Sequence, residues 1–245
     1  MNKKIEYRPI QGEYDYLGEY SEGCIFVRNN TNEWKVGYID KFGKIVVDMV
    51  YYGRVGDSYV HVPAFHDGLA ALMNENGKFG YVDRTGRTVV PFIYDMTFCY
   101  REGVAFVKKD GKWGGVDRTG KPVVPFIYDY IAGTFENHQA EAILHGEKGY
   151  IDLNGYFHRQ PIQPSKHIQA LSREETPIPK AISVDYELIT KFKDGLAVIK
   201  KDNRYGYVDR FGDIVIPIEY TRATAFSEGI AAVQKNGSWY ILELV

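Results

Sequence analysis

The stretch KWGGVDRTGKPVVPFIYD, from Lys112 to Asp129, occurs with variations along the whole chain of 245 residues. The preceding copy is GKFGYVDRTGRTVVPFIYD, from Gly77 to Asp95, and Asp83 lies 34 residues before its counterpart Asp117. A fixed period of this length is typical of repeat proteins, in which each unit buries its apolar face against its neighbours. The sequence therefore predicts a repeat architecture.

Two kinds of turn signal divide each copy. Type I′ hairpins favour Asn-Gly or Asp-Gly, because both residues tolerate a positive φ, and such pairs occur at Asn76-Gly77, Asp110-Gly111 and Asn236-Gly237. The second signal is Asp with Gly three residues later, which suits a type I turn closed by a Gly bulge. It begins at Asp40, Asp83, Asp117, Asp152 and Asp209. Converging aspartates could bind a hard cation, but Lys or Arg follows four of the five, which favours a turn-capping role.

The segments between these turns are short and rich in β-forming residues. The first segment of a unit is exemplified by Leu69–Met73, Val104–Lys108 and Leu196–Lys200, which are too short for a typical helix. The second begins at an aromatic-Gly pair. The third is a Val-Val or Val-Ile run that we expect to end at proline, which lacks an amide for further pairing. Each unit is thus predicted to be a three-stranded antiparallel meander.

The aromatic residue before Gly is the predicted core element of each unit. It is Phe79, Trp113 or Tyr205, and an aromatic side chain buries roughly 150 to 250 Å². One such ring per unit would form a continuous ladder between neighbouring units.

We predict an all-β fold, a single domain over residues 1–245 built of about six repeats. Irregular units span 18–64 and 135–164, and an insertion rich in proline spans 157–183. The last unit lacks a third strand, which the N-terminal segment around Arg8-Pro9-Ile10 could supply. This count favours a closed, propeller-like ring, and an open curved β-solenoid is the alternative.

Composition limits the classes of partner and compartment. The formal net charge of −2 gives no general attraction to nucleic acid or to an anionic membrane, so neither is expected as a partner. The N-terminus lacks the apolar core of a secretory signal, and we expect a cytoplasmic protein. In that compartment Cys24 and Cys99 would be free thiols.

Signals for catalysis or metal binding are weak. His138, Glu141 and His145 lie close in sequence, but strand residues three apart point to opposite faces, and zinc needs three or four convergent ligands. No nucleophile elbow or phosphate-binding loop is recognisable. We therefore expect no catalytic residues, no metal and no cofactor.

The motif Lys112-Trp113-Gly114-Gly115-Val116-Asp117, with Val123-Val124-Pro125 behind it and Lys78-Phe79-Gly80-Tyr81-Val82-Asp83 before it, resembles the bacterial WG (KWG) repeat family. The resemblance covers residues 20–245 apart from the insertion, with departures at Lys148, at Trp34-Lys35-Val36-Gly37 and at Trp239-Tyr240. It implies a β-rich repeat protein that acts as an interaction scaffold, and it carries over no catalytic residues.

Two functions follow as hypotheses. The first is a non-catalytic scaffold that binds a cytosolic protein, for example a toxin or effector, because repeat arrays present extended surfaces and Tyr and Trp are common interface anchors. The alternative is a lectin-like module that binds a glycan or small ligand on exposed Trp or Tyr rings. The candidate binding residues are Tyr51, Tyr52, Tyr59, His158, Arg159, His167 and Arg173. The sequence does not specify an oligomeric state.

Overall fold

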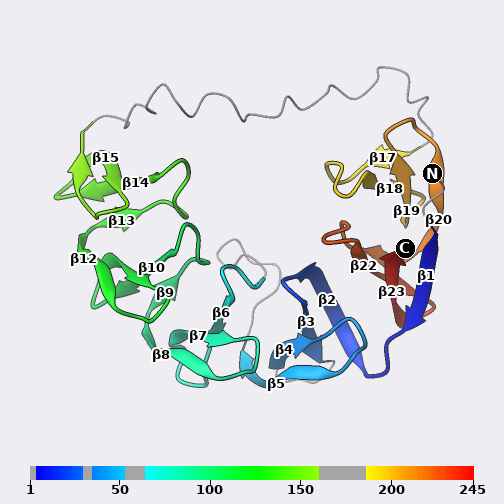
Figure 1. The fold of residues 1–245 in the computed structure, drawn as a ribbon, viewed down its shortest axis with the longest axis horizontal. Coiled ribbons are helices and arrows are strands. Elements are labelled where there is room, and N and C mark those ends of the chain that lie inside the picture. The colour runs from blue at the N-terminus through cyan, green and yellow to red at the C-terminus, as the bar shows by residue number, and fades with distance from the viewer. Residues whose placement is uncertain (1–3, 30–34, 53–63, 160–185) are drawn as a thin grey trace. The chain divides into compact units, whose positions relative to one another are not determined.

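A computed structural model describes residues 4–29, 35–52, 64–159 and 186–245. Every regular element in these ranges is a β-strand, which confirms the all-β prediction (Figure 1). Contacts divide the chain into two compact units. Unit 1 comprises Met1–Asn32, Gly37–Met49 and Glu175–Val245, and unit 2 comprises Glu33–Val36 and Val50–Glu174. The single domain predicted for 1–245 stays a prediction.

Unit 2 contains repeats 2, 3 and 4. Repeat 2 has β6 (Leu69–Met73), β7 (Phe79–Asp83) and β8 (Thr88–Tyr94); repeat 3 has β9 (Met96–Thr97), β10 (Val104–Lys109), β11 (Lys112–Asp117) and β12 (Pro122–Tyr128); repeat 4 has β13 (Tyr130–Ile131), β14 (Gln139–Leu144), β15 (Glu147–Asp152) and β16 (Phe157–His158). The strands of each repeat pair antiparallel with their sequence neighbours.

Unit 1 contains repeats 5 and 6 and most of repeat 1. Repeat 5 has β17 (Glu187–Leu188), β18 (Leu196–Lys201), β19 (Arg204–Asp209) and β20 (Ile214–Tyr220); repeat 6 has β21 (Arg222–Ala223), β22 (Ile230–Lys235), β23 (Ser238–Leu244) and β1 (Ile5–Pro9); repeat 1 has β2 (Tyr14–Ser21), β3 (Cys24–Asn29), β4 (Lys35–Ile39) and β5 (Ile45–Tyr52). Strands β4 and β5 have residues in both units.

The sheets differ from the predicted meander in two respects. Four of them carry an additional two-residue strand before the first long strand, namely β9, β13, β17 and β21. The third strand also does not end at proline, since β8, β12 and β20 continue through Pro91, Pro125 and Pro217. A sheet edge tolerates proline because its missing amide is not needed for pairing there.

A bulge in the third strand explains why Gly follows the aromatic residue. In repeat 5, the register between β19 and β20 shifts between Tyr205↔Tyr220 and Tyr207↔Ile216, so extra residues of β20 lie over Gly206. A Cβ atom on Gly206 would lie 2.7 Å from the Ile216 carbonyl oxygen and 2.9 Å from the Ile218 nitrogen. The Gly of the motif is therefore required by the close approach of the neighbouring backbone.

The aspartate turns form as predicted. In all five, Oδ1 of the Asp accepts hydrogen bonds from the amides two and four residues later. At Asp83 and Asp117 a Thr hydroxyl adds a third bond, and this bond is the main cause that lowers the pKa of each carboxyl. The capping interpretation is confirmed.

Two of the three predicted type I′ pairs are confirmed, at Asp110-Gly111 and Asn236-Gly237, where both residues have positive φ. The prediction for Asn76-Gly77 is wrong, because only Gly77 has positive φ there. Asn74 Oδ1 instead accepts the amides of Asn76 and Lys78, as in the aspartate turns. An Asn three residues before Gly thus overrides the Asn-Gly hairpin signal.

A second series of tight turns, not predicted, precedes β3 in repeat 1 and the first long strand in each of the other repeats. Both central residues have positive φ at Glu22-Gly23, Asp67-Gly68, Glu102-Gly103, Asn137-His138, Asp194-Gly195 and Glu228-Gly229. Acidic side chains of these turns bond to the corresponding turn of the next repeat. Asp67 accepts the Gly103 amide at 3.1 Å and Glu102 lies 2.6 Å from His138 Nδ1 in unit 2. In unit 1, Asp194 accepts the Gly229 amide and Glu228 the Glu22 amide, both at 2.8 Å.

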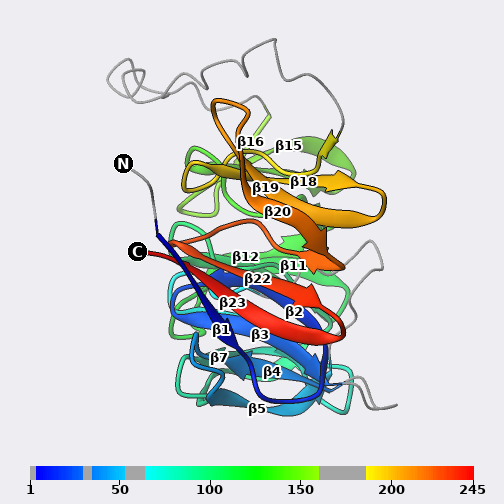
Figure 2. The ribbon, with the colours of Figure 1, turned by 90° about the vertical axis from the view of Figure 1, so that its right-hand side faces the viewer.

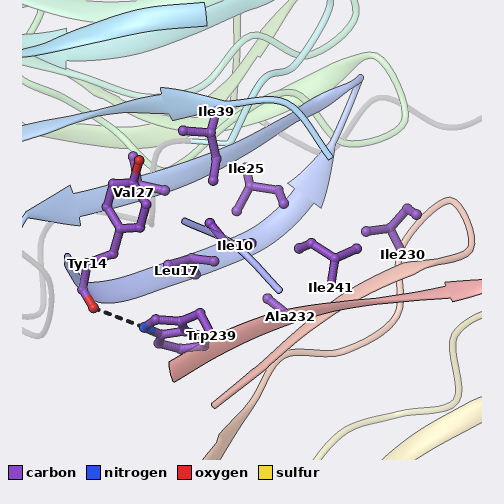
Figure 3. Packing of buried hydrophobic residues seen from close by; sticks show 10 residues of the cluster. All are labelled: Ile10, Tyr14, Leu17, Ile25, Val27, Ile39, Ile230, Ala232, Trp239 and Ile241. Carbon is purple, nitrogen blue, oxygen red and sulfur yellow. Dashed lines mark hydrogen bonds between the residues drawn. The ribbon is translucent and has the colours of Figure 1, made fainter. Parts of the chain in front are cut away.

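The core lies between the sheets of consecutive repeats. Figure 3 shows the cluster in unit 1 where Ala232, Trp239 and Ile241 of repeat 6 face Leu17, Ile25 and Val27 of repeat 1. The Trp239 indole nitrogen donates to the Tyr14 carbonyl oxygen at 3.0 Å. Burying these apolar faces supplies the stability that an isolated small sheet lacks.

The predicted aromatic ladder is confirmed for Trp113, whereas Phe79 and Tyr205 are only half-buried. The deepest rings instead follow the Gly, at Tyr81 and Tyr207. Their hydroxyls donate to the carbonyl oxygens of Phe98 and Thr224 at 2.6 and 2.8 Å. A buried Tyr needs such an acceptor for its hydroxyl, and burial raises the pKa of both residues.

The N-terminal segment completes repeat 6, as the strand count predicted. β1 pairs antiparallel with β23 over five positions, from Ile5↔Leu244 to Pro9↔Tyr240, and the two strands lie side by side in Figure 2. Closure of the whole array into a ring stays a prediction, as does the alternative of an open curved array.

Glu243 on β23 joins this strand pair to the aspartate turn of repeat 1. Its two carboxylate oxygens lie 2.5 Å from Lys41 Nζ and 3.3 Å from Arg8 Nη2. The bond from Lys41 is the main cause that lowers the pKa of Glu243 from its usual 4.5.

Replacing Glu243 with Gln is therefore expected to cost about 1 kcal/mol of stability at neutral pH. Since the folded pKa is lowered, the wild type should keep its full advantage above about pH 4.5 and lose it as the pH falls through the folded value. Urea denaturation of both proteins across this range measures the difference. A difference that does not change with pH would contradict the charged role of Glu243.

Candidate interaction surface

Repeat 3, the middle repeat of unit 2, uses both faces of its sheet for packing. In β10, Ala105 and Val107 pack against repeat 2. The alternate residues Val104 and Phe106, together with Trp113 of β11, pack against repeat 4. The face that looks toward the following repeat is thus apolar in repeat 3.

Repeat 4 differs at the corresponding face. Its residues Ala140, Ala142 and Ile151 pack on repeat 3, so the opposite side of β14 and β15 looks away from that core. In register, Glu141 is opposite Tyr150, and Ile143 is opposite both Lys148 and Tyr130. Because residues that pair directly share a face of a sheet, these five side chains lie on one side of repeat 4. Strands β13 to β15 are labelled in Figure 1 and drawn in yellow-green.

An open pocket of about 540 Å³ lies on this side. Its lining consists of Tyr130, Ala132, Glu141, Ala142, Ile143, Lys148, Gly149, Tyr150 and Arg159. The volume falls within the range of small-molecule sites, and it equally suits side chains of a protein partner. We call the surface formed by Tyr130, Glu141, Ile143, Lys148, Tyr150 and Arg159 the repeat-4 face.

The repeat-4 face carries two opposite charges, on Glu141 and Lys148, beside the charge of Arg159. Arg159 is paired with Glu147, Nε to Oε2 at 3.1 Å. Neither Glu141 nor Lys148 makes a side-chain hydrogen bond or ion pair with another described residue. Tyr130 is 47% exposed, although its ring is in edge contact with Trp113, with ring centroids 6.4 Å apart. The face thus offers one carboxylate, one ammonium group and two phenol rings to a ligand.

The substitutions that create this face can be read from the repeat alignment. Lys148 occupies the position of Trp113, since each follows the hairpin and pairs with the equivalent residue of the preceding strand, Ile143 or Lys108. Glu141 likewise occupies the position of Phe106. The loss of the aromatic residue at Lys148 is visible in the sequence, whereas its proximity to Glu141, Tyr130 and Tyr150 appears only in the strand register. Two charges at core positions were the available signal.

Of the predicted binding residues, Arg159 lines the pocket. His158, although opposite Tyr150 in the register, is bonded to the turn of its own repeat, with Nε2 3.0 Å from Asp152 Oδ2. Tyr59, His167 and Arg173 lie outside the described residues.

Tyr51 and Tyr52 are half-buried at the end of β5 and are occupied by neighbours. The Tyr51 ring stacks on Phe92, with centroids 5.4 Å apart, and Lys35 Nζ lies 3.7 Å from the centroid of Tyr52. Tyr52 also pairs with Met73 of β6. Neither tyrosine is among the residues that line the pocket of repeat 4.

No group of three or more His, Cys, Asp or Glu side chains within residues 4–29, 35–52, 64–159 and 186–245 could hold a metal ion. Of the histidines considered for metal binding, His138 is bonded to Glu102. Neither Cys24 nor Cys99 is part of a disulfide. The described part of the chain contains no helix with the length and hydropathy that a membrane crossing requires.

Several solved structures resemble the chain at low identity. Streptogramin B lyase is 12% identical, with a TM-score of 0.38 over 100% of this chain and 98% of that one. The WD40 β-propeller domain of Doa1 is 10% identical, with a TM-score of 0.36 and 97% of each chain covered. BamB from Moraxella catarrhalis is 11% identical, with a TM-score of 0.37 over 94% of this chain and 84% of that one. No curated protein matches the sequence.

The family comparison is more specific, because it rests on the recurring motif itself. The model described as "WG containing repeat" matches six times, at residues 10–34, 37–79, 79–113, 113–137, 181–205 and 205–239. These matches cover most of the chain and include the aromatic-Gly pairs and four of the five aspartate turns, all but the one at Asp152. The chain therefore belongs to the WG containing repeat family.

Proposed function

We propose that this protein is a non-catalytic scaffold that binds a protein partner through the repeat-4 face. The observation that carries the proposal is the replacement of core residues by Glu141 and Lys148 on a face that is apolar in repeat 3. An unpaired charge at such a position would be costly if another apolar sheet covered it. A partner with polar groups and apolar side chains fits this face better.

The aromatic side chains support binding of a protein. Tyr130 and Tyr150 flank the charged pair, and tyrosine is a frequent anchor at interfaces because it combines a large apolar ring with a polar hydroxyl. The partner of the initial hypothesis, a cytosolic toxin or effector, remains part of the proposal, as does the cytoplasmic location.

We expect capture of the partner to depend on the repeat-4 face. The intact protein, immobilised and incubated with lysate of the organism that encodes it, should retain a specific protein, identified by mass spectrometry. Tyr150→Ala should reduce retention at least about tenfold, as is typical for loss of an interface anchor. Tyr156→Ala is the matched control, because Tyr156 is an exposed tyrosine of the same repeat outside the pocket lining. Equal retention by all three proteins would contradict the proposed site.

Glycan binding is the second candidate, and the pocket is the observation that favours it. An exposed Tyr130 beside Glu141 and Lys148 combines a ring for stacking with groups that can bond to sugar hydroxyls. Trp113 and Trp239 are buried, so neither supplies the exposed tryptophan platform of the initial hypothesis. A glycan array probed with wild type and Tyr130→Ala separates the two functions. Glycan signals that disappear in the variant would favour a lectin.

A further inference from the structure

We infer that the repeat-4 face pairs with the same face of a second copy of this chain, in a two-fold symmetric dimer. The inference rests on the proposed function, since it names the partner of that surface. In a two-fold interface, a residue on one subunit meets a different residue on its partner, and the reverse contact follows by symmetry. A self-complementary surface therefore needs both members of each interacting pair.

The repeat-4 face contains both members. Glu141 and Lys148 stand on neighbouring strands and are offset diagonally, since Glu141 is opposite Tyr150 and Lys148 is opposite Ile143. Both lack a partner among the described residues. A two-fold axis that lies in the interface parallel to the two sheets, and crosses the midpoint of the line from Glu141 to Lys148 at a right angle, brings Glu141 of each copy to Lys148 of the other. Each dimer would then contain two equivalent ion pairs.

The remaining side chains do not favour a strongly charged partner. Arg159 is already neutralised by Glu147, so the face carries no net charge. Ile143, Tyr130 and Tyr150 supply apolar area around the charged pair. The whole chain has a formal net charge of only −2, so the long-range repulsion between two copies is small.

Sheet-on-sheet packing is also how this chain forms its other contacts. Repeat 3 presents Phe106 and Trp113 to Ala140 and Ala142 of repeat 4. The repeat-4 face belongs to an antiparallel sheet of the same kind, so another copy offers a surface of compatible shape. Glu141 and Lys148 occupy the positions of the aromatic residues Phe106 and Trp113. Two opposite charges at these positions would fix the orientation in which the two copies pack.

The experiment uses charge reversal in the full chain, with sedimentation velocity over a concentration series. Wild type should show a concentration-dependent dimer. Glu141→Lys and Lys148→Glu should each weaken dimerisation at least about tenfold, because like charges then meet at both symmetric contacts. Far-UV circular dichroism and thermal melting check that both variants fold, which is expected because the two side chains are exposed.

Mixing the two variants gives the decisive result. In a mixed dimer, position 141 of the Glu141→Lys chain meets position 148 of the Lys148→Glu chain with opposite charges, and the native Lys148 and Glu141 meet at the other contact. The mixture should therefore dimerise with wild-type affinity although neither variant does so alone. The inference is overturned by a wild type that stays monomeric, by single variants that dimerise normally, or by a mixture that does not recover. A monomeric wild type that still captures a different protein from lysate, dependent on Tyr150, would overturn this inference and leave the scaffold function standing.

Discussion

Replacing Trp113 with Ala is expected to lower the free energy of unfolding by about 3–5 kcal/mol. The Trp113 side chain is only 3% exposed and belongs to the cluster that joins repeats 3 and 4. Its ring stacks on Phe98 with centroids 5.1 Å apart and planes inclined by 18°. Removing it would leave a cavity between the sheets of repeats 3 and 4, and the cost of this cavity adds to the loss of buried apolar surface. Chemical denaturation followed by far-UV circular dichroism measures the loss.

Phe211→Ala is the control for this experiment. Phe211 occupies the aspartate turn of repeat 5 and is 90% exposed, so its loss should change stability by less than about 0.5 kcal/mol. Similar effects of the two substitutions would mean that Trp113 contributes no more to the core than an exposed ring.

The second large effect is expected from Gly206→Ala, a change of a single methyl group. The added Cβ would approach the Ile216 carbonyl oxygen to 2.7 Å and the Ile218 backbone to 2.9 Å. Backbone atoms of a paired strand cannot rotate away as a side chain can, so β20 must shift. We expect a loss of about 1–3 kcal/mol, the usual range for overpacking.

Ser238→Ala is a suitable control, because it changes an exposed position of a strand that pairs like β19 but has no bulge recorded against it. Equal unfolding midpoints for wild type and Gly206→Ala would show that β20 moves freely, and the close approach would then not explain the Gly of the motif. Both midpoints are measured in the same urea titration.

The recurring stretch predicted most of the fold because turn chemistry is local. The Asp117 turn, the Asp110-Gly111 hairpin and the strand Val104–Lys109 all depend on residues within a few positions of one another. The prediction that the third strand ends at proline is wrong because a sheet edge tolerates proline. Whether a strand lies at an edge depends on distant segments of the chain. The extra strand β9 has only two residues, which is too short for a periodic pattern.

The candidate site was harder to predict, since it depends on which face of repeat 4 lies against repeat 3. Lys148 and Glu141 are seven residues apart, and only the β14–β15 register places them on one side. His158 shows the reverse case. The sequence predicts it as a binding residue, but its side chain is bonded to the turn at Asp152. Side-chain type alone therefore did not distinguish a binding residue from a structural one.

The acidic turns have a consequence for how such chains change length during evolution. Asp67 bonds to the turn at Gly103, and Glu102 of that same turn bonds to His138, so each turn donates to one neighbour and accepts from the other. In each described case a carboxylate of one turn is bonded to the turn of the next repeat, at a backbone amide in three cases and at the His138 ring in the fourth. A duplicated repeat inserted in frame would form these bonds with both neighbouring repeats, whereas a partial repeat would leave a carboxylate or an amide without its partner. Gain and loss of whole repeats is thus the least disruptive way for this architecture to change length.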